Sequence, residues 1–168
     1  MSNTQLVRSV ITESGISRIR CECGLWADHV VEEFLNILGQ DPASLRRKNW
    51  MQDHVVVNAF FMPSAPAVAR IMMAVLAGEH DTLRREILLA SILGLSDSDS
   101  PEFLQECQSV ISRGVWMLIE EASSGRSAAC AAYAFEILQC LEEHEWTQML
   151  QNDYSHDIPM HGQPNHRR

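Results

Sequence analysis

Amphipathic helix patterns recur along this sequence, and glycine, proline or a helix-capping residue separates each from the next. In the second half, apolar residues return every three or four positions over four segments: 64–77, 82–95, 101–119 and 127–145. That spacing puts them on one face of a helix, and the last segment is apolar on two faces, as in a helix packed between neighbours. Residues that favour helix starts precede the first three: Ser64, Asp81 or Thr82, and Ser100-Pro101. Gly114 predicts a bend within the third segment. We therefore predict an all-α fold.

The first half carries weaker patterns. A short helical pattern covers 4–12, and residues 16–23 alternate weakly with the period of a strand. A clearer helix is predicted over 25–38. Asp41-Pro42 predicts the start of another helix that runs to about Asp53. Residues 55–61 are ambiguous, because their β-branched residues favour a strand while the flanking helices favour a buried helix or loop.

Two helix pairs resemble each other in sequence. The pair at 64–95 aligns with the pair at 110–141, at an offset of 44 in the first helix and 46 in the second. A period of about 40–47 residues built from antiparallel helix pairs is typical of HEAT repeats. With the pair near 25–53 as an earlier unit, we predict a short HEAT-like α-solenoid of stacked helix pairs. The alternative is an irregular helical bundle.

Length and composition indicate one folded domain. The chain has 168 residues, of which 46% are hydrophobic and 21% charged, and this is enough to bury a substantial core. No apolar run approaches the length of a membrane span, and the N-terminus lacks the pattern of a signal peptide. We expect a cytoplasmic protein with a single helical domain over 1–150. The polar, unpatterned segment 151–168 is expected to be a flexible tail.

The acidic residues are concentrated in one part of the chain. Residues 86–145 hold eleven carboxylates against Arg113 and Arg126, which accounts for the whole net charge of −9. Such a field repels nucleic acid and attracts basic proteins. It is equally explained by an acidic surface that keeps the protein in solution.

The cysteines do not form a disulfide pattern. There are five, widely scattered, and such thiols are more often buried or idle. Cys21-Glu22-Cys23 with His29 is the one hint of a metal site, but zinc sites usually space paired cysteines by about two to four residues and need about four ligands. No second pair is evident, and His54 has no obvious partner. We therefore predict no metal and no cofactor.

Catalytic motifs are also missing from the sequence. The adjacent pairs Glu120-Glu121 and Glu142-Glu143 would point about 100° apart on a helix, which is typical of a solvated face rather than an acid–base couple. The four tryptophans are core candidates first and interface residues second, with Trp146 the strongest interface candidate. We expect a binding protein rather than an enzyme.

One stretch resembles a known family. Asn49–Val55 leads through Met62-Pro63-Ser64-Ala65-Pro66-Ala67-Val68 into the helix that ends near Leu76. This resembles a block in bacterial HEAT-like proteins, many of which are immunity proteins of polymorphic toxin or contact-dependent growth inhibition systems. The resemblance covers about 25–145, and the sequence departs from the usual leucines at Met72 and Met73.

The resemblance implies a protein that binds and neutralises one cognate toxin in a 1:1 complex, without contacting nucleic acid or membrane directly. Many such toxins are nucleases, whose active sites are basic because they bind phosphates. An acidic inhibitor would associate quickly with such a site through electrostatic steering. The acidic part of the chain is then the predicted toxin-binding surface, and the residues we select are Asp97, Asp99, Glu120, Glu121, Glu142 and Glu143.

Two alternative functions share the fold. A HEAT-like adaptor or scaffold would bind a protein or peptide in its groove. A HEAT-like nucleic-acid enzyme, such as a DNA-repair glycosylase, would need a basic concave face. The only basic clusters are Arg46-Arg47-Lys48 and Arg84-Arg85, which nearby acids balance, so this alternative is less favoured.

Overall fold

Helices make up most of the chain in the computed structural model, which describes residues 3–39, 50–58, 60–97, 101–143 and 146–150. The helices follow the apolar spacing of the sequence, and residues 146–150 are helical as well. The elements in order are α1 (Asn3–Ser14), η1 (Ile16–Arg18), α2 (Asp28–Gly39), β1 (Val56–Val57), β2 (Phe60–Phe61), α4 (Ala65–Leu76), α5 (Thr82–Ser96), α6 (Leu104–Ser112), α7 (Val115–Ser123) and α8 (Ala128–Cys140).

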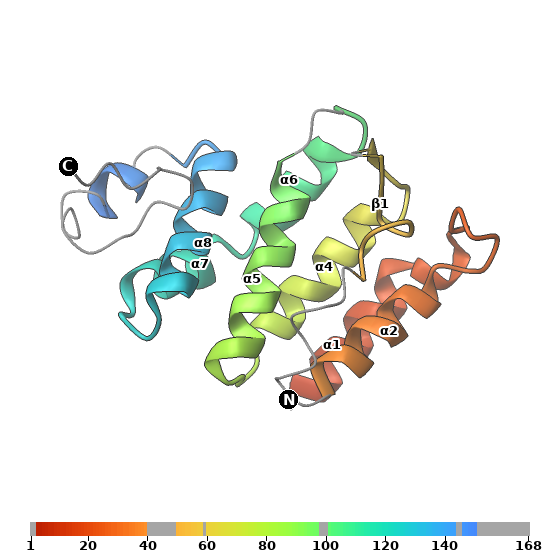
Figure 1. Cartoon of the computed structure of the whole chain (residues 1–168), viewed down its shortest axis with the longest axis horizontal. Coiled ribbons are helices and arrows are strands. Elements are labelled where there is room, and N and C mark those ends of the chain that lie inside the picture. The colour runs from red at the N-terminus through yellow and green to blue at the C-terminus, as the bar shows by residue number, and fades with distance from the viewer. Residues whose placement is uncertain (1–2, 40–49, 59, 98–100, 144–145, 151–168) are drawn as a thin grey trace, which may run out of the picture.

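The helices lie in a row (Figure 1). α1 and α2 form one end, α7 and α8 form the other, and α4, α5 and α6 lie between them. α4 packs against α1, α5 and α6, while α5 also packs against α8, which in turn contacts α7. The all-α prediction is confirmed at the level of a mostly helical fold.

The centre of the row holds most of the largest fully buried side chains. Met72 and Leu76 of α4 and Leu88, Leu89 and Ile92 of α5 are almost completely buried. Each fully buried side chain of this size contributes about 1.5–3 kcal/mol of hydrophobic stabilisation. The core continues from α1 through to Leu150 in the last described helix. None of the helices described is long and apolar enough to cross a membrane.

The region before α4 differs from the sequence prediction. α2 begins at Asp28 rather than near 25, because residues 19–27 form a tight turn. The helix predicted over 41–53 falls mostly on residues that the structure does not describe. Residues 50, 51 and 53 are turns, and Gln52 forms a bridge with Val56. The ambiguous segment 55–61 contains a two-stranded antiparallel hairpin, with Val56 opposite Phe61.

The helix predicted over 101–119 is two helices. α6 begins at Leu104, after Phe103 in the left-handed region at φ 63°, so Pro101 does not occupy the first helical turn. α6 and α7 are separated at Gly114, where a side chain would meet the terminal methyl groups of Met73 and Met117. A glycine there permits this close approach between α4 and the start of α7.

The last long helix is shorter than predicted. α8 ends at Cys140 instead of near 145. Glu142 then takes a left-handed conformation at φ 59°, which an α-helix does not continue through. The tail predicted over 151–168 lies outside the described residues.

Candidate functional site

A tight turn presents two cysteines just before α2. Arg20 pairs with Trp26 as an antiparallel bridge, and the Cys21 N–H donates to the Leu25 carbonyl at 2.9 Å. The Gly24 N–H donates back to the Cys21 carbonyl at 2.9 Å, and Gly24 has φ +87°, which favours glycine. The chain therefore reverses around Cys21 and Cys23, and both thiols remain beside the start of α2.

Two histidines complete a cluster with these cysteines. His29 comes from the first turn of α2, and His54 from the turn before β1. One ligand atom from each of Cys21, Cys23, His29 and His54 lies within 4.8 Å of all the others. His54 is therefore a fourth candidate ligand beside Cys21, Cys23 and His29. The two histidines supply the second ligand pair that the sequence alone does not reveal.

Distances within the cluster are short. Cys21 Sγ lies 3.3 Å from His54 Nδ1, and Cys23 Sγ lies 3.5 Å from His29 Nε2. The two imidazoles approach each other at 3.5 Å between His29 Nε2 and His54 Nδ1. Nitrogen and sulfur ligands in this number could hold one metal ion.

The cluster lies at the protein surface, and Cys21 is its one buried residue. Cys21 is buried, Cys23 is exposed, and both histidines are half-buried. Burial raises the pKa of the Cys21 thiol, while backbone N–H groups of Cys23 and Glu22 oppose that shift.

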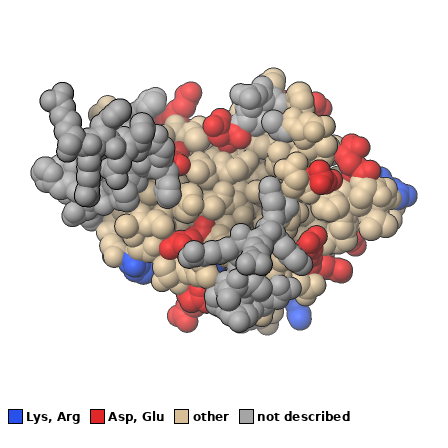
Figure 2. Space-filling view, in the orientation of Figure 1, with Lys and Arg blue, Asp and Glu red and all other residues tan. Residues whose placement is uncertain are grey.

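The predicted toxin-binding residues are not equivalent in the structure. Asp97, Glu120 and Glu142 are exposed, and Glu143 is half-buried. Asp99 lies outside the described residues. Figure 2 shows acidic side chains dispersed over the visible face rather than gathered into one continuous patch.

Glu121 is the exception, and its predicted exposure is wrong. Its side chain is only 1% exposed, and its Oε1 accepts from Arg85 Nε at 2.5 Å and from an Arg126 guanidinium nitrogen at 2.7 Å. The other oxygen, Oε2, is buried without a hydrogen-bond partner among the described residues. Glu121 therefore holds α5 and α7 together instead of facing a partner, because the two arginines draw it inward.

An exposed and a half-buried tryptophan form a pair at the other end of the row. The Trp116 ring on α7 is 67% exposed and meets the Trp146 ring edge-on, with centroids 5.2 Å apart. Glu120 is four residues after Trp116, so both lie on one helix face. By contrast Trp50 is buried against Phe34, at 4.7 Å between ring centroids, so only it fulfils the expectation of a core tryptophan.

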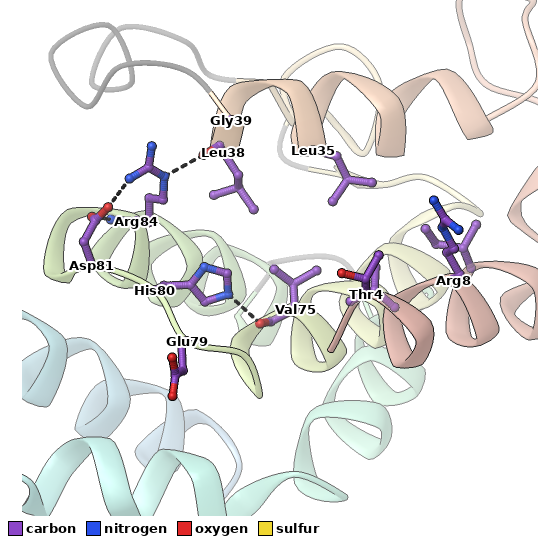
Figure 3. Close-up of a pocket in the computed structure, with 12 residues that line it drawn as sticks. Thr4, Arg8, Leu35, Leu38, Gly39, Val75, Glu79, His80, Asp81 and Arg84 are labelled. Atoms are coloured by element: carbon purple, nitrogen blue, oxygen red, sulfur yellow. Dashed lines mark hydrogen bonds and ion pairs between the residues drawn. The ribbon is translucent and has the colours of Figure 1, made fainter. Parts of the chain in front are cut away.

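A cavity of about 600 Å³ lies between α1, the end of α2 and the connection from α4 to α5. Figure 3 shows Arg84 between Leu38 and Asp81, with His80 pointing to the Val75 carbonyl at 2.7 Å. The Arg84 Nε donates to the Leu38 carbonyl at 2.6 Å, and Arg84 also pairs with Asp81. These groups satisfy one another and tie α2 to α5, so the contacts at this cavity are structural.

Comparison of the chain with protein-family models, with curated proteins and with solved structures finds no match.

Proposed function

We propose that this chain is an immunity protein that binds and neutralises a cognate bacterial toxin in the cytoplasm. The observation that carries the proposal is the exposed Trp116, which packs against the half-buried Trp146 and lies beside the exposed Glu120 on α7. Tryptophan is the residue most enriched among interface residues that dominate binding energy. A large indole left 67% exposed is costly in water, and a partner would cover it.

Charge supports a basic partner. Glu120 is exposed on the same face as Trp116, and its one described ion pair is to the half-exposed Arg126 at 3.0 Å. Asp97 and Glu142 are also exposed in this acidic part of the chain. An exposed tryptophan beside an exposed carboxylate, on a chain of net charge −9, suits a basic toxin domain such as a nuclease, since complementary charge speeds association.

The helix arrangement is compatible with a short HEAT-like solenoid. α4 with α5 and α7 with α8 are contacting pairs, and they are the two pairs whose sequences align. Repeat proteins of this kind bind partners through extended surfaces. We therefore favour binding over catalysis, with the adaptor or scaffold function as the alternative.

Co-purification with the product of the neighbouring gene tests the proposal. We expect a 1:1 complex that weakens as salt is raised, because exposed charges are screened. No complex, together with a neighbouring product that is harmless to cells, would refute the immunity function.

Variants test the surface itself. We expect Trp116→Ala to weaken toxin binding by about 30-fold or more, as for an interface hot spot. Phe60→Ala removes another exposed aromatic, on β2, and is the matched control. Changing Asp97, Glu120 and Glu142 to lysine should slow association, whereas the same reversal at exposed Glu13, Glu32 and Glu79 should have less effect. Equal effects of the two charge reversals would rule out this surface.

A further inference from the structure

Four potential metal ligands converge from three separate segments of the chain. Cys21 and Cys23 come from the turn at 19–27, His29 from α2 and His54 from the turn before β1. Their ligand atoms lie within 4.8 Å of one another although Cys21 and His54 are 33 positions apart. We propose that these four residues bind one Zn²⁺ ion in a tetrahedral Cys₂His₂ site.

The distances suit this assignment. Zinc binds sulfur at about 2.3 Å and nitrogen at about 2.0–2.1 Å, so tetrahedral ligands lie about 3.3–3.8 Å apart. The Cys21–His54, Cys23–His29 and His29–His54 ligand atoms are 3.3, 3.5 and 3.5 Å apart. The remaining pairs, all within 4.8 Å, need only a small contraction. Only one residue separates the two cysteines, which is a shorter spacing than zinc sites usually have. Here the tight turn at Gly24 reverses the chain around them.

His29 is already oriented as a ligand. Its Nδ1 lies 2.6 Å from the Trp26 carbonyl oxygen, so Nδ1 carries the proton and donates to that oxygen. The other ring nitrogen, Nε2, then faces Cys23 and His54. Metal-bound histidines almost always make such a bond with their other nitrogen, because it fixes the tautomer and the ring orientation.

His54 is held through its backbone. The Ser64 hydroxyl donates to the His54 carbonyl at 3.3 Å, and Ser64 is 1% exposed. Ser64 stands at the start of α4 but makes no capping bond there. Its hydroxyl therefore positions the turn that carries His54 instead of stabilising the helix end.

The ligand types select the metal. Two thiolates and two imidazoles in a tetrahedral arrangement favour zinc, whereas Mg²⁺ and Ca²⁺ require oxygen ligands. Four protein ligands leave no open position, so the ion would be structural. Binding displaces the thiol protons of Cys21 and Cys23 and links the turn, α2 and the segment before β1.

Metal content and spectroscopy of the full chain test the proposal independently of any toxin. His156, His161 and His166 are changed to glutamine in every sample, so that they do not add a second metal site. We expect one zinc per chain, removed by a chelator under reducing conditions and restored by Zn²⁺ with a rise in Tm. Co²⁺ should give tetrahedral visible bands and a thiolate charge-transfer band, which arises only from cysteine ligands.

Ligand variants locate the site. Cys23→Ser and His54→Ala should lose at least about 100-fold in zinc affinity, and Ser64→Ala about 10-fold. Cys140→Ser and His80→Gln, outside the cluster, should retain the affinity of the parent protein, which carries only the three tail substitutions. Absence of the charge-transfer band from the parent protein, or the same affinity in Cys23→Ser and Cys140→Ser, would overturn the proposal. In a metal-free protein, rapid alkylation of Cys23 would identify a thiol–imidazole pair instead.

Discussion

The buried carboxylate of Glu121 gives a quantitative prediction. Its side chain is 1% exposed and faces Arg85, which is 15% exposed, and Arg126, which is 48% exposed. Glu121→Gln keeps the size of the side chain and removes its charge. Arg126 can turn to water, but the mostly buried Arg85 loses its anion, and removing one partner of a buried pair costs about 3–5 kcal/mol.

Urea denaturation followed by circular dichroism measures the effect. We expect Glu121→Gln to lower the free energy of unfolding by about 3 kcal/mol, the lower end of that range, because Arg85 retains a bond to the Gly78 carbonyl. For a chain of this length that corresponds to a fall in Tm of about 6–12 °C.

Two variants make the test specific. Glu120→Gln removes the neighbouring exposed carboxylate and should cost less than about 1 kcal/mol. Arg85→Met combined with Glu121→Leu replaces the pair by apolar groups and should recover most of the lost stability. If Glu121→Gln costs no more than Glu120→Gln, the argument from the buried charge is refuted.

Two further perturbations test other features. Ser127 caps α8 by accepting from the Cys130 N–H, so Ser127→Ala should cost about 1 kcal/mol in urea denaturation, and the same change at exposed Ser9 much less. Burial raises the pKa of the Cys107 thiol to about 12 from an ordinary value of 9.0. Above pH 9 only the unfolded chain then loses this proton, so stability falls with rising pH by up to about 1.4 kcal/mol per unit. Cys107→Ala should flatten this decline between pH 9 and 11, and an unchanged slope would contradict it.

Local sequence signals predicted the helices better than their ends. The periodic segments form α4, α5 and α8 because burying their apolar faces stabilises these helices. Asp81 caps α5 by accepting a hydrogen bond from the Arg84 N–H, as its position in the sequence predicts. Gly114 is a local signal for the break between α6 and α7, whereas its close approach to Met73 depends on the packing of α4.

In the candidate metal site too, the sequence reveals the ligands that are neighbours along the chain but not the distant one. Cys21, Cys23 and His29 are close in sequence, so their spacing was visible. His54 lies 25 positions beyond His29 and joins them only through the fold. A histidine at the edge of the apolar segment 55–61 is the only local signal that could have identified it. Glu121 was misassigned for a similar reason, since its partner Arg85 lies 36 positions away.

The row of helices separates the two proposed sites. The Cys–His cluster belongs to the end with α2, the tryptophan pair to the end with α7, and α4 and α5 lie between them (Figure 1). Sites without shared contacts change independently, and their energies add. Changes at the aromatic end of the row should therefore leave the proposed zinc affinity of the cysteine-containing end intact.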